Sequence, residues 1–243
     1  MGRVLESRVV LRSPLQEAVV AAYGGAEYWR NSKAVEAVVS AGGFAFVTKL
    51  QPAFHRMKVH ARIAEPRVRM RPGEWGGTTG ILEGQAVRLE DGGGQVTEMR
   101  ADPRKLFPGG RRLVWWDRLD QTYFSGYALW NYLTFPALLL REDVAWKQIG
   151  PASLEARFPA ALPTHNAVQQ FHFDPKTFLL RQHDYTAEVF GGWAKAANVV
   201  LEHGRWMDIP FPSKRRVTPR RPDGTPRAGP VLVAITIDDW KLV

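Results

Sequence analysis

The sequence of 243 residues contains no cysteine. This absence excludes disulfide bonds, thiolate zinc sites, iron–sulfur clusters and a cysteine nucleophile, so any chemistry must use other side chains. The sequence also lacks a P-loop, a GxSxG nucleophile elbow, an HExxH zinc motif and a strand-to-helix dinucleotide fingerprint. We therefore expect no cofactor, whether nucleotide, flavin or metal.

Long hydrophobic runs are missing as well. The longest one, around Trp130 to Leu140, contains Asn131 and Pro136 and is shorter than the roughly 20 residues that a membrane-spanning helix needs. The first 15 residues carry four charged side chains among the apolar ones, which is not typical of a secretory signal. We expect a cytoplasmic protein without stable membrane insertion.

Positive charge is abundant, with a formal net charge of +9. Much of the excess lies at residues 214–216 and 220–221, which flank a turn, and at three arginines that alternate along residues 67–71. We interpret these groups as a solvated outer face. Nucleic acid binding through phosphates is the alternative, but no nucleic-acid-binding motif supports it, so nucleic acid is not an expected partner.

Hydrophobic residues make up 45% of the chain, which is enough for the core of a single domain over residues 1–243. From residue 34 onward, apolar and polar side chains alternate over short segments, as is typical of strands with one buried face. The expected strands cover residues 34–40, 44–50, 58–63, 67–71, 81–89, 95–100, 167–173, 178–189, 215–219 and 231–238.

Two regions favour helices instead. Ser13, Pro14 and Gln16 form a helix-start pattern, and residues 113–146 are rich in aromatics, with a spacing that suits helices broken at Gly126 and Pro136. The expected fold is therefore mainly β (α+β). It consists of a single curved antiparallel sheet, or incomplete barrel, closed by the N-terminal and central helices around an apolar, aromatic-rich cavity.

This layout resembles the lipoprotein-carrier fold of the LolA and LppX type. The features in common are the helix that ends in Ala22-Tyr23-Gly24-Gly25, the next strand with its Gly42 turn into Phe44 to Val47, and the hairpin from Gln169 to Tyr185. The resemblance implies an apolar cavity suited to an acyl chain or another hydrophobic molecule. Because those carriers are exported and this chain shows no export signal, we do not expect it to carry lipoproteins.

Three of the six histidines lie between residues 165 and 183. If Phe173 faces Phe178 across the turn at residues 174–177, antiparallel pairing places His165 about one diagonal step from Asp184, on the same face of the hairpin. A carboxylate beside an imidazole orients the ring and stabilises its cation, which gives an acid or base near neutral pH.

The register thus predicts a proton-transfer pair of His165 and Asp184, with His183, Tyr185 or Arg181 assisting. The alternative is structural: His165 caps the strand, and Asp184 bonds to the backbone or to Arg181. A zinc site of His165, His172 and His183 is not expected, because His172 and His183 lie roughly 13 Å apart on this register at about 3.3 Å per residue, whereas zinc ligands lie about 2 Å from the ion.

The aromatic middle of the chain is interpreted first as core packing and second as a surface that stacks on a ligand. The residues expected to contact a ligand are Trp115, Trp116, Tyr123, Tyr127, Trp130, Gln169, Phe171, His172, Gln182 and Trp193. The leading functional hypothesis is binding of a hydrophobic small molecule of acyl, isoprenoid, polyketide-like or aromatic type. The alternative is a cofactor-independent enzyme, a cyclase, isomerase, lyase or hydrolase, that uses the same cavity.

Overall fold

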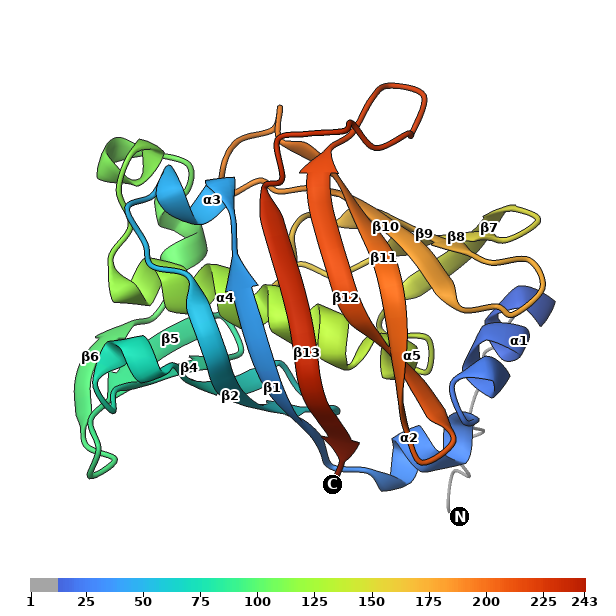
Figure 1. Cartoon of the computed structure of the whole chain (residues 1–243), viewed down its shortest axis with the longest axis horizontal. Helices are drawn as coiled ribbons and strands as arrows, with labels where there is room; N and C mark the ends of the chain where they lie inside the picture. The colour runs from blue at the N-terminus through green and yellow to red at the C-terminus, as the bar shows by residue number, and fades with distance from the viewer. Residues whose placement is uncertain (1–12) are drawn as a thin grey trace, which may run out of the picture.

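The computed structural model describes residues 13–243 as one antiparallel sheet with a helix inside it (Figure 1). The sheet has 13 strands in the order β6-β5-β4-β3-β2-β1-β13-β12-β11-β10-β9-β8-β7. The strands are β1 (Ala34–Gly42), β2 (Phe54–Arg62), β3 (Arg67–Arg71), β4 (Thr79–Glu83), β5 (Ala86–Glu90), β6 (Val96–Arg100), β7 (Ala145–Gly150), β8 (Ser153–Arg157), β9 (Val168–Phe173), β10 (Leu180–Thr186), β11 (Lys195–Trp206), β12 (Ile209–Pro219) and β13 (Val233–Leu242).

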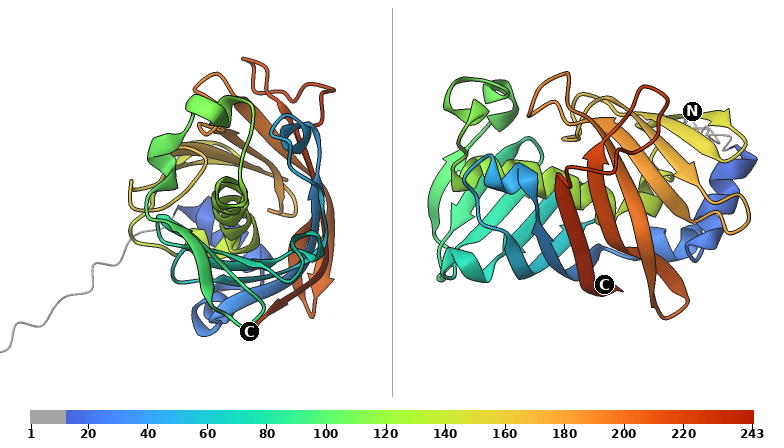
Figure 2. Two further views of the ribbon diagram at one scale, coloured as in Figure 1. Left: turned by 90° about the vertical axis from the view of Figure 1, so that its left-hand side faces the viewer. Right: turned by 45° about the horizontal axis from the view of Figure 1, so that its top comes forward.

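The helices are few. The α-helices are α1 (Pro14–Ala22), α2 (Ala26–Asn31), α3 (Phe44–Val47), α4 (Arg118–Leu133) and α5 (Phe135–Leu138). Three short 3-10 helices are η1 (Gly73–Trp75), η2 (Pro103–Leu106) and η3 (Gly110–Leu113). Viewed from the end, the sheet curves around α4, which lies within it (left view of Figure 2). Because β6 and β7 end the strand order and do not pair with each other, the barrel is incomplete, and the expected fold class is confirmed.

The first helix forms for the reasons that its sequence predicts. The Ser13 side chain accepts a hydrogen bond from the Gln16 backbone, the Gln16 side chain accepts one from the Ser13 backbone, and Pro14 occupies the first turn. This capping box satisfies amide groups that have no partner inside a helix. The strand alternation is confirmed as well: Val68 and Met70 of β3 are buried, whereas Arg67 and Arg69 face outward and form ion pairs with glutamates of β4 and β5.

The prediction of a strand at residues 44–50 is wrong. Residues 44–47 form α3, and the next strand, β2, begins at Phe54. The backbone amides of Phe44 and Ala45 donate hydrogen bonds to the carbonyls of Val231 and Leu232, next to β13. These hydrogen bonds to residues far along the chain hold residues 44–47 in a helical turn. Local alternation of apolar and polar residues does not reveal them. Sequence alternation also missed β7, β8, β11 and the first half of β12.

The central helix is longer than expected. We predicted a break at Gly126, but α4 runs without interruption from Arg118 to Leu133, and only the second break, next to Pro136, is confirmed. A Cβ on Gly126 would lie 2.7 Å from the Cβ of Leu82 in β4. Gly126 therefore allows the helix to approach the sheet closely.

The close approach at Gly126 predicts a stability effect. Overpacking costs about 1–3 kcal/mol, whereas alanine has a helix propensity about 1 kcal/mol better than glycine. We expect Gly126→Ala to lower the free energy of unfolding by about 1 kcal/mol in urea denaturation. Gly92→Ala is the matched control, because a Cβ there meets nothing within 4 Å. Equal denaturation midpoints for both variants and the unchanged protein would contradict the close packing of Gly126 against Leu82.

The expectation that the first 15 residues are not a secretory signal concerns residues that lie almost entirely outside the described part of the chain, which starts at residue 13. Among the helices within residues 13–243, none combines the length and the hydropathy that crossing a membrane requires.

Candidate ligand cavity

A cavity of about 600 Å³ opens between α4 and the β10–β13 side of the sheet. It lies where α3, the loop at residues 187–194 and the segment between β12 and β13 meet. In Figure 1, α3 and the segment between β12 and β13 (red) are both at the top of the molecule. The lining is mostly apolar and includes Phe44, Leu113, Phe124, Phe190, Val217 and Val233.

A second, larger hollow of about 990 Å³ differs in character. Its lining comes from β1–β4, β13 and the tip of the β11–β12 hairpin, and half of its residues are charged. Two of its charges pair with each other, Lys241 with Glu36 at 2.9 Å, and its Arg69 pairs with Glu90 outside the hollow at 3.0 Å. Because half of the residues that line this open hollow are charged, whereas the walls of the first cavity are mostly apolar, the first cavity is the better site for a small-molecule ligand.

Two polar residues, His165 and Tyr185, line the inner part of the apolar cavity. Their rings stack at 3.6 Å between centroids. The hydroxyl of Tyr132, from α4, lies 2.7 Å from Nε2 of His165 and 2.8 Å from the hydroxyl of Tyr185. Arg104 holds the backbone at His165 by donating to the carbonyls of Thr164 and His165.

Nδ1 of His165 has no hydrogen-bond partner within residues 13–243, although His165 is only 1% exposed. Burial, with the nearby charge of Arg104, lowers the pKa of His165 well below its ordinary value. Burial also raises the pKa of Tyr132 to about 12 and that of Tyr185 well above its ordinary value. At neutral pH the imidazole is therefore uncharged and the phenols keep their protons. If Nε2 of His165 accepts from Tyr132, Nδ1 carries the proton and is a free donor. If Nε2 donates to Tyr132, Nδ1 is a free acceptor.

Arg215 lies deeper, on the inner face of β12. It is 2% exposed, its guanidinium carbon lies 4.9 Å from the centroid of the Tyr132 ring, and its Nη2 is 3.4 Å from the Tyr132 carbonyl. Burial lowers its pKa. The expectation that residues 214–216 form a solvated outer face is wrong for Arg215, because side chains alternate between the two faces of a strand and its neighbours Lys214 and Arg216 take the outer one.

The predicted pair of His165 and Asp184 does not form. Phe173 pairs with Leu180 and not with Phe178 as expected, and a β-bulge at Arg181 then shifts the register by one more residue, so that Asp184 pairs with Gln170. The bulge places Asp184 on the outer face of the sheet. There its carboxylate lies 3.1 Å from Nε2 of His172.

Two further donors complete the surroundings of that carboxylate. Nη1 of Arg220 lies 3.2 Å from it, and the Gln182 amide donates to it at 2.8 Å. Of the proposed assisting groups, Tyr185 lies beside His165, whereas His183 is buried with its Nε2 2.6 Å from the Gln169 oxygen. Arg181 is exposed. Of the expected pair and its assistants, only His165 and Tyr185 line the cavity.

Of the residues expected to contact a ligand, Trp193 lines the cavity and is 80% exposed. Several others are buried core residues: Trp116, Tyr123, Tyr127, Trp130, Gln169 and Phe171. His172 and Gln182 lie with Asp184 on the outer face, and Trp115 lies at the surface, where Arg111 stacks on it at 4.4 Å. Sequence reasoning missed Lys49, Arg112 and Phe190, which line the cavity, because they come from short loops and helices without periodic patterns.

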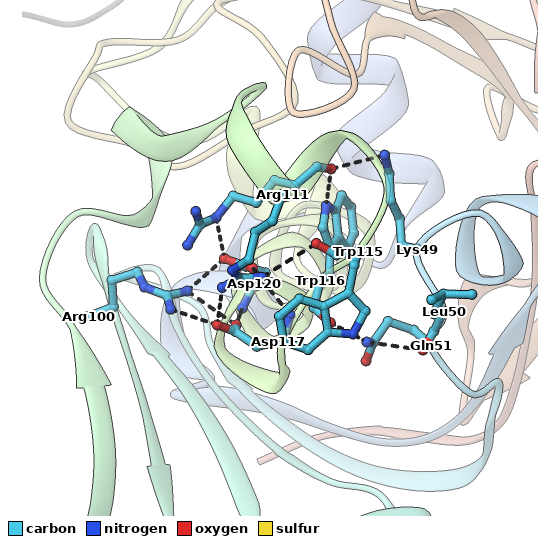
Figure 3. Close-up of polar contacts among 10 residues, drawn as sticks. Lys49, Leu50, Gln51, Arg100, Arg111, Trp115, Trp116, Asp117 and Asp120 are labelled. Atoms are coloured by element: carbon cyan, nitrogen blue, oxygen red, sulfur yellow. Dashed lines mark hydrogen bonds and ion pairs between the residues drawn. The ribbon is translucent and has the colours of Figure 1, made fainter.

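An ion cluster next to the cavity fixes the start of α4 (Figure 3). Asp117 and Asp120 form a capping box at this helix end. Asp120 is fully buried, accepts hydrogen bonds from Arg100 at 2.6 Å and Arg112 at 2.7 Å, and forms an ion pair with Arg111 at 2.9 Å. Arg112 is thereby held at the cavity wall.

The capping box predicts a pH effect. Burial by itself raises the pKa of Asp117, but hydrogen bonds and charge from Arg100, the Asp120 amide and Arg111 outweigh it and hold the pKa at about 2. A pKa that is lower in the folded state adds stability above the unfolded pKa of about 4, and this stability is lost as the pH falls toward 2. Asp117→Asn should thus lower the free energy of unfolding by about 2 kcal/mol at pH 7. The difference from the unchanged protein, followed by urea denaturation, should shrink between about pH 4 and pH 2. A difference independent of pH would contradict this.

No protein-family model matches the chain, and no curated protein matches it. Similar solved structures exist. One is a LolA superfamily protein from Nitrosomonas europaea, with 8% identity, 94% of this chain and 93% of the other covered, and a TM-score of 0.47. Another is a DUF1329 family protein from Desulfovibrio piger, with 12% identity, 94% and 91% covered, and a TM-score of 0.48.

Proposed function

We propose that the protein binds a hydrophobic small molecule in the 600 Å³ cavity. The observation that carries the proposal is the cavity itself. Its volume lies within the range of about 300–1,000 Å³ that is typical of small-molecule sites, and its lining combines apolar walls with a few polar groups, as such sites do. The hydrophobic effect supplies the main free energy of binding when the ligand leaves water.

Trp193 offers a direct test, because it lines the cavity and is exposed enough to be replaced without disturbing the core. We expect Trp193→Ala to weaken binding of the neutral probe N-phenyl-1-naphthylamine about fivefold, through the loss of roughly 1 kcal/mol of apolar contact. Fluorescence titration measures this affinity. Tyr28→Ala is the control, since Tyr28 is 53% exposed and does not line the cavity. No probe binding to the unchanged protein would overturn the proposal.

A cofactor-independent enzyme is the second candidate, and the free Nδ1 of His165 favours it. In the tautomer with Nδ1 unprotonated, a neutral imidazole at the cavity wall accepts a proton from a carbon acid, while Tyr132 and Tyr185 adjust their hydrogen bonds to the resulting charge. The low pKa of His165 limits its strength as a base. A bound anion beside the ring would raise that pKa.

This second candidate predicts proton exchange on a bound ketone. In deuterated buffer, the protein should speed deuterium uptake next to the carbonyl of a long-chain methyl ketone, as followed by mass spectrometry. Replacing the imidazole in His165→Gln should return the rate to that of buffer alone. Equal rates with the unchanged protein and the variant would leave binding as the function.

A further inference from the structure

Five cationic side chains line the cavity, whereas none of its lining residues is acidic. The cations are Lys49, Arg112, Lys195, Arg220 and Arg227. Arg112 and Arg220 already have carboxylate partners, Asp120 at 2.7 Å and Asp184 at 3.2 Å. Within residues 13–243 the other three cations form no ion pair with a carboxylate. The cavity therefore carries an excess of positive charge.

Lys49 is the most informative of these cations, because it is buried. Only 6% of it is exposed. Its ammonium donates to two backbone carbonyls, those of Arg112 at 3.0 Å and Leu113 at 2.6 Å. An ammonium has three donors, so one of the three has no acceptor within residues 13–243.

The surroundings of the Lys49 ammonium are otherwise aromatic. It lies 5.2 Å from the centroid of the Phe190 ring and 5.7 Å from that of Trp116. Burial lowers the pKa of Lys49, because the charged ammonium loses favourable hydration free energy when it leaves water without a counter-charge. An anion in the cavity would restore that free energy, since opposite charges attract strongly in a medium of low dielectric constant.

An apolar path leads inward from Lys49. The ring of Phe190 lies 5.5 Å from that of Phe124, which lies 6.2 Å from that of His165. Phe190, Phe124 and His165 all line the cavity. A charged head at Lys49 thus leaves room for an apolar chain along Phe124 toward Val217.

Resting on the proposed function, we infer that the ligand is an amphiphile with a single anionic head group and that Lys49 binds this head group. The carboxylate of a fatty acid is the simplest such group, and a phosphate monoester shares its chemistry. Lys195 and Arg227, both exposed at the mouth, attract the anion during entry and stabilise it less, because solvent screens them.

Displacement of N-phenyl-1-naphthylamine tests this inference. Lauric acid should compete at least tenfold more strongly than its uncharged methyl ester, and dodecyl phosphate should do so as well. Lys49→Gln should bring the acid to the level of the ester, whereas Lys49→Arg should keep the preference. Lys147→Gln is the matched control, since Lys147 is exposed on β7, away from the cavity.

The outcomes separate the two proposals. If the acid and the ester compete equally with the unchanged protein, or if folded Lys49→Gln keeps the preference, the head-group inference is wrong and hydrophobic binding stands. If neither the probe nor any lauryl compound binds, the proposed function fails too. Circular dichroism shows whether Lys49→Gln folds. If it does not, the double variant Lys195→Gln with Arg227→Gln replaces it and should weaken lauric acid binding at low salt but not binding of the ester.

Discussion

A helix buried on every side determines the rest of this structure. Every residue of α4 from Leu119 to Leu133 is buried, so the helix must satisfy its polar groups without water. The Thr122 hydroxyl and the Asn131 amide nitrogen donate to carbonyls one turn earlier in the same helix, whereas Oδ1 of Asn131 and the hydroxyls of Ser125 and Tyr127 have no partner within residues 13–243. Asp117 and Asp120 cap its first turn and form ion pairs with the arginines around it. The sheet curves around this buried helix.

The position of α4 within the sheet explains why there is a cavity. The helix α4 packs mainly against β2–β6, with Gly126 close to Leu82 and Gly80 close to Thr122. Side chains of the helix, among them Phe124 and Tyr132, extend toward the strands on the opposite side, β10–β13. An off-centre helix in a curved sheet thus leaves a space, and this space contains His165, Tyr185 and the unpaired cations.

Local sequence patterns predicted the features that depend on neighbouring residues. The Ser13 capping box and the alternation of β3 are confirmed, since each rests on contacts within a few residues or on one buried face. The open curved sheet followed from many such segments together. In contrast, the bulge at Arg181 has no local signature, and it moved Asp184 to the outer face, away from His165. A shift of one residue exchanges the two faces of a strand, so the predicted acid–base pair depended on something that the sequence did not specify.

The candidate site was hard to predict for a related reason. Its residues come from segments far apart in the chain: Lys49 after α3, Arg112 from η3, and Arg227 between β12 and β13. None belongs to a motif, and a basic chain has many lysines and arginines that only face solvent. Among the cations that line the cavity, Lys49 is distinguished by burial without a carboxylate partner, which becomes visible only when the fold is known.

A crystal structure of the protein with lauric acid tests the account most directly. The account predicts an acyl chain in the cavity between α4 and β10–β13, in contact with Phe124 and Val217, with its carboxylate within hydrogen-bond distance of the Lys49 ammonium. A chain bound elsewhere on the molecule, or a cavity that stays free of ligand at saturating lauric acid, would contradict it.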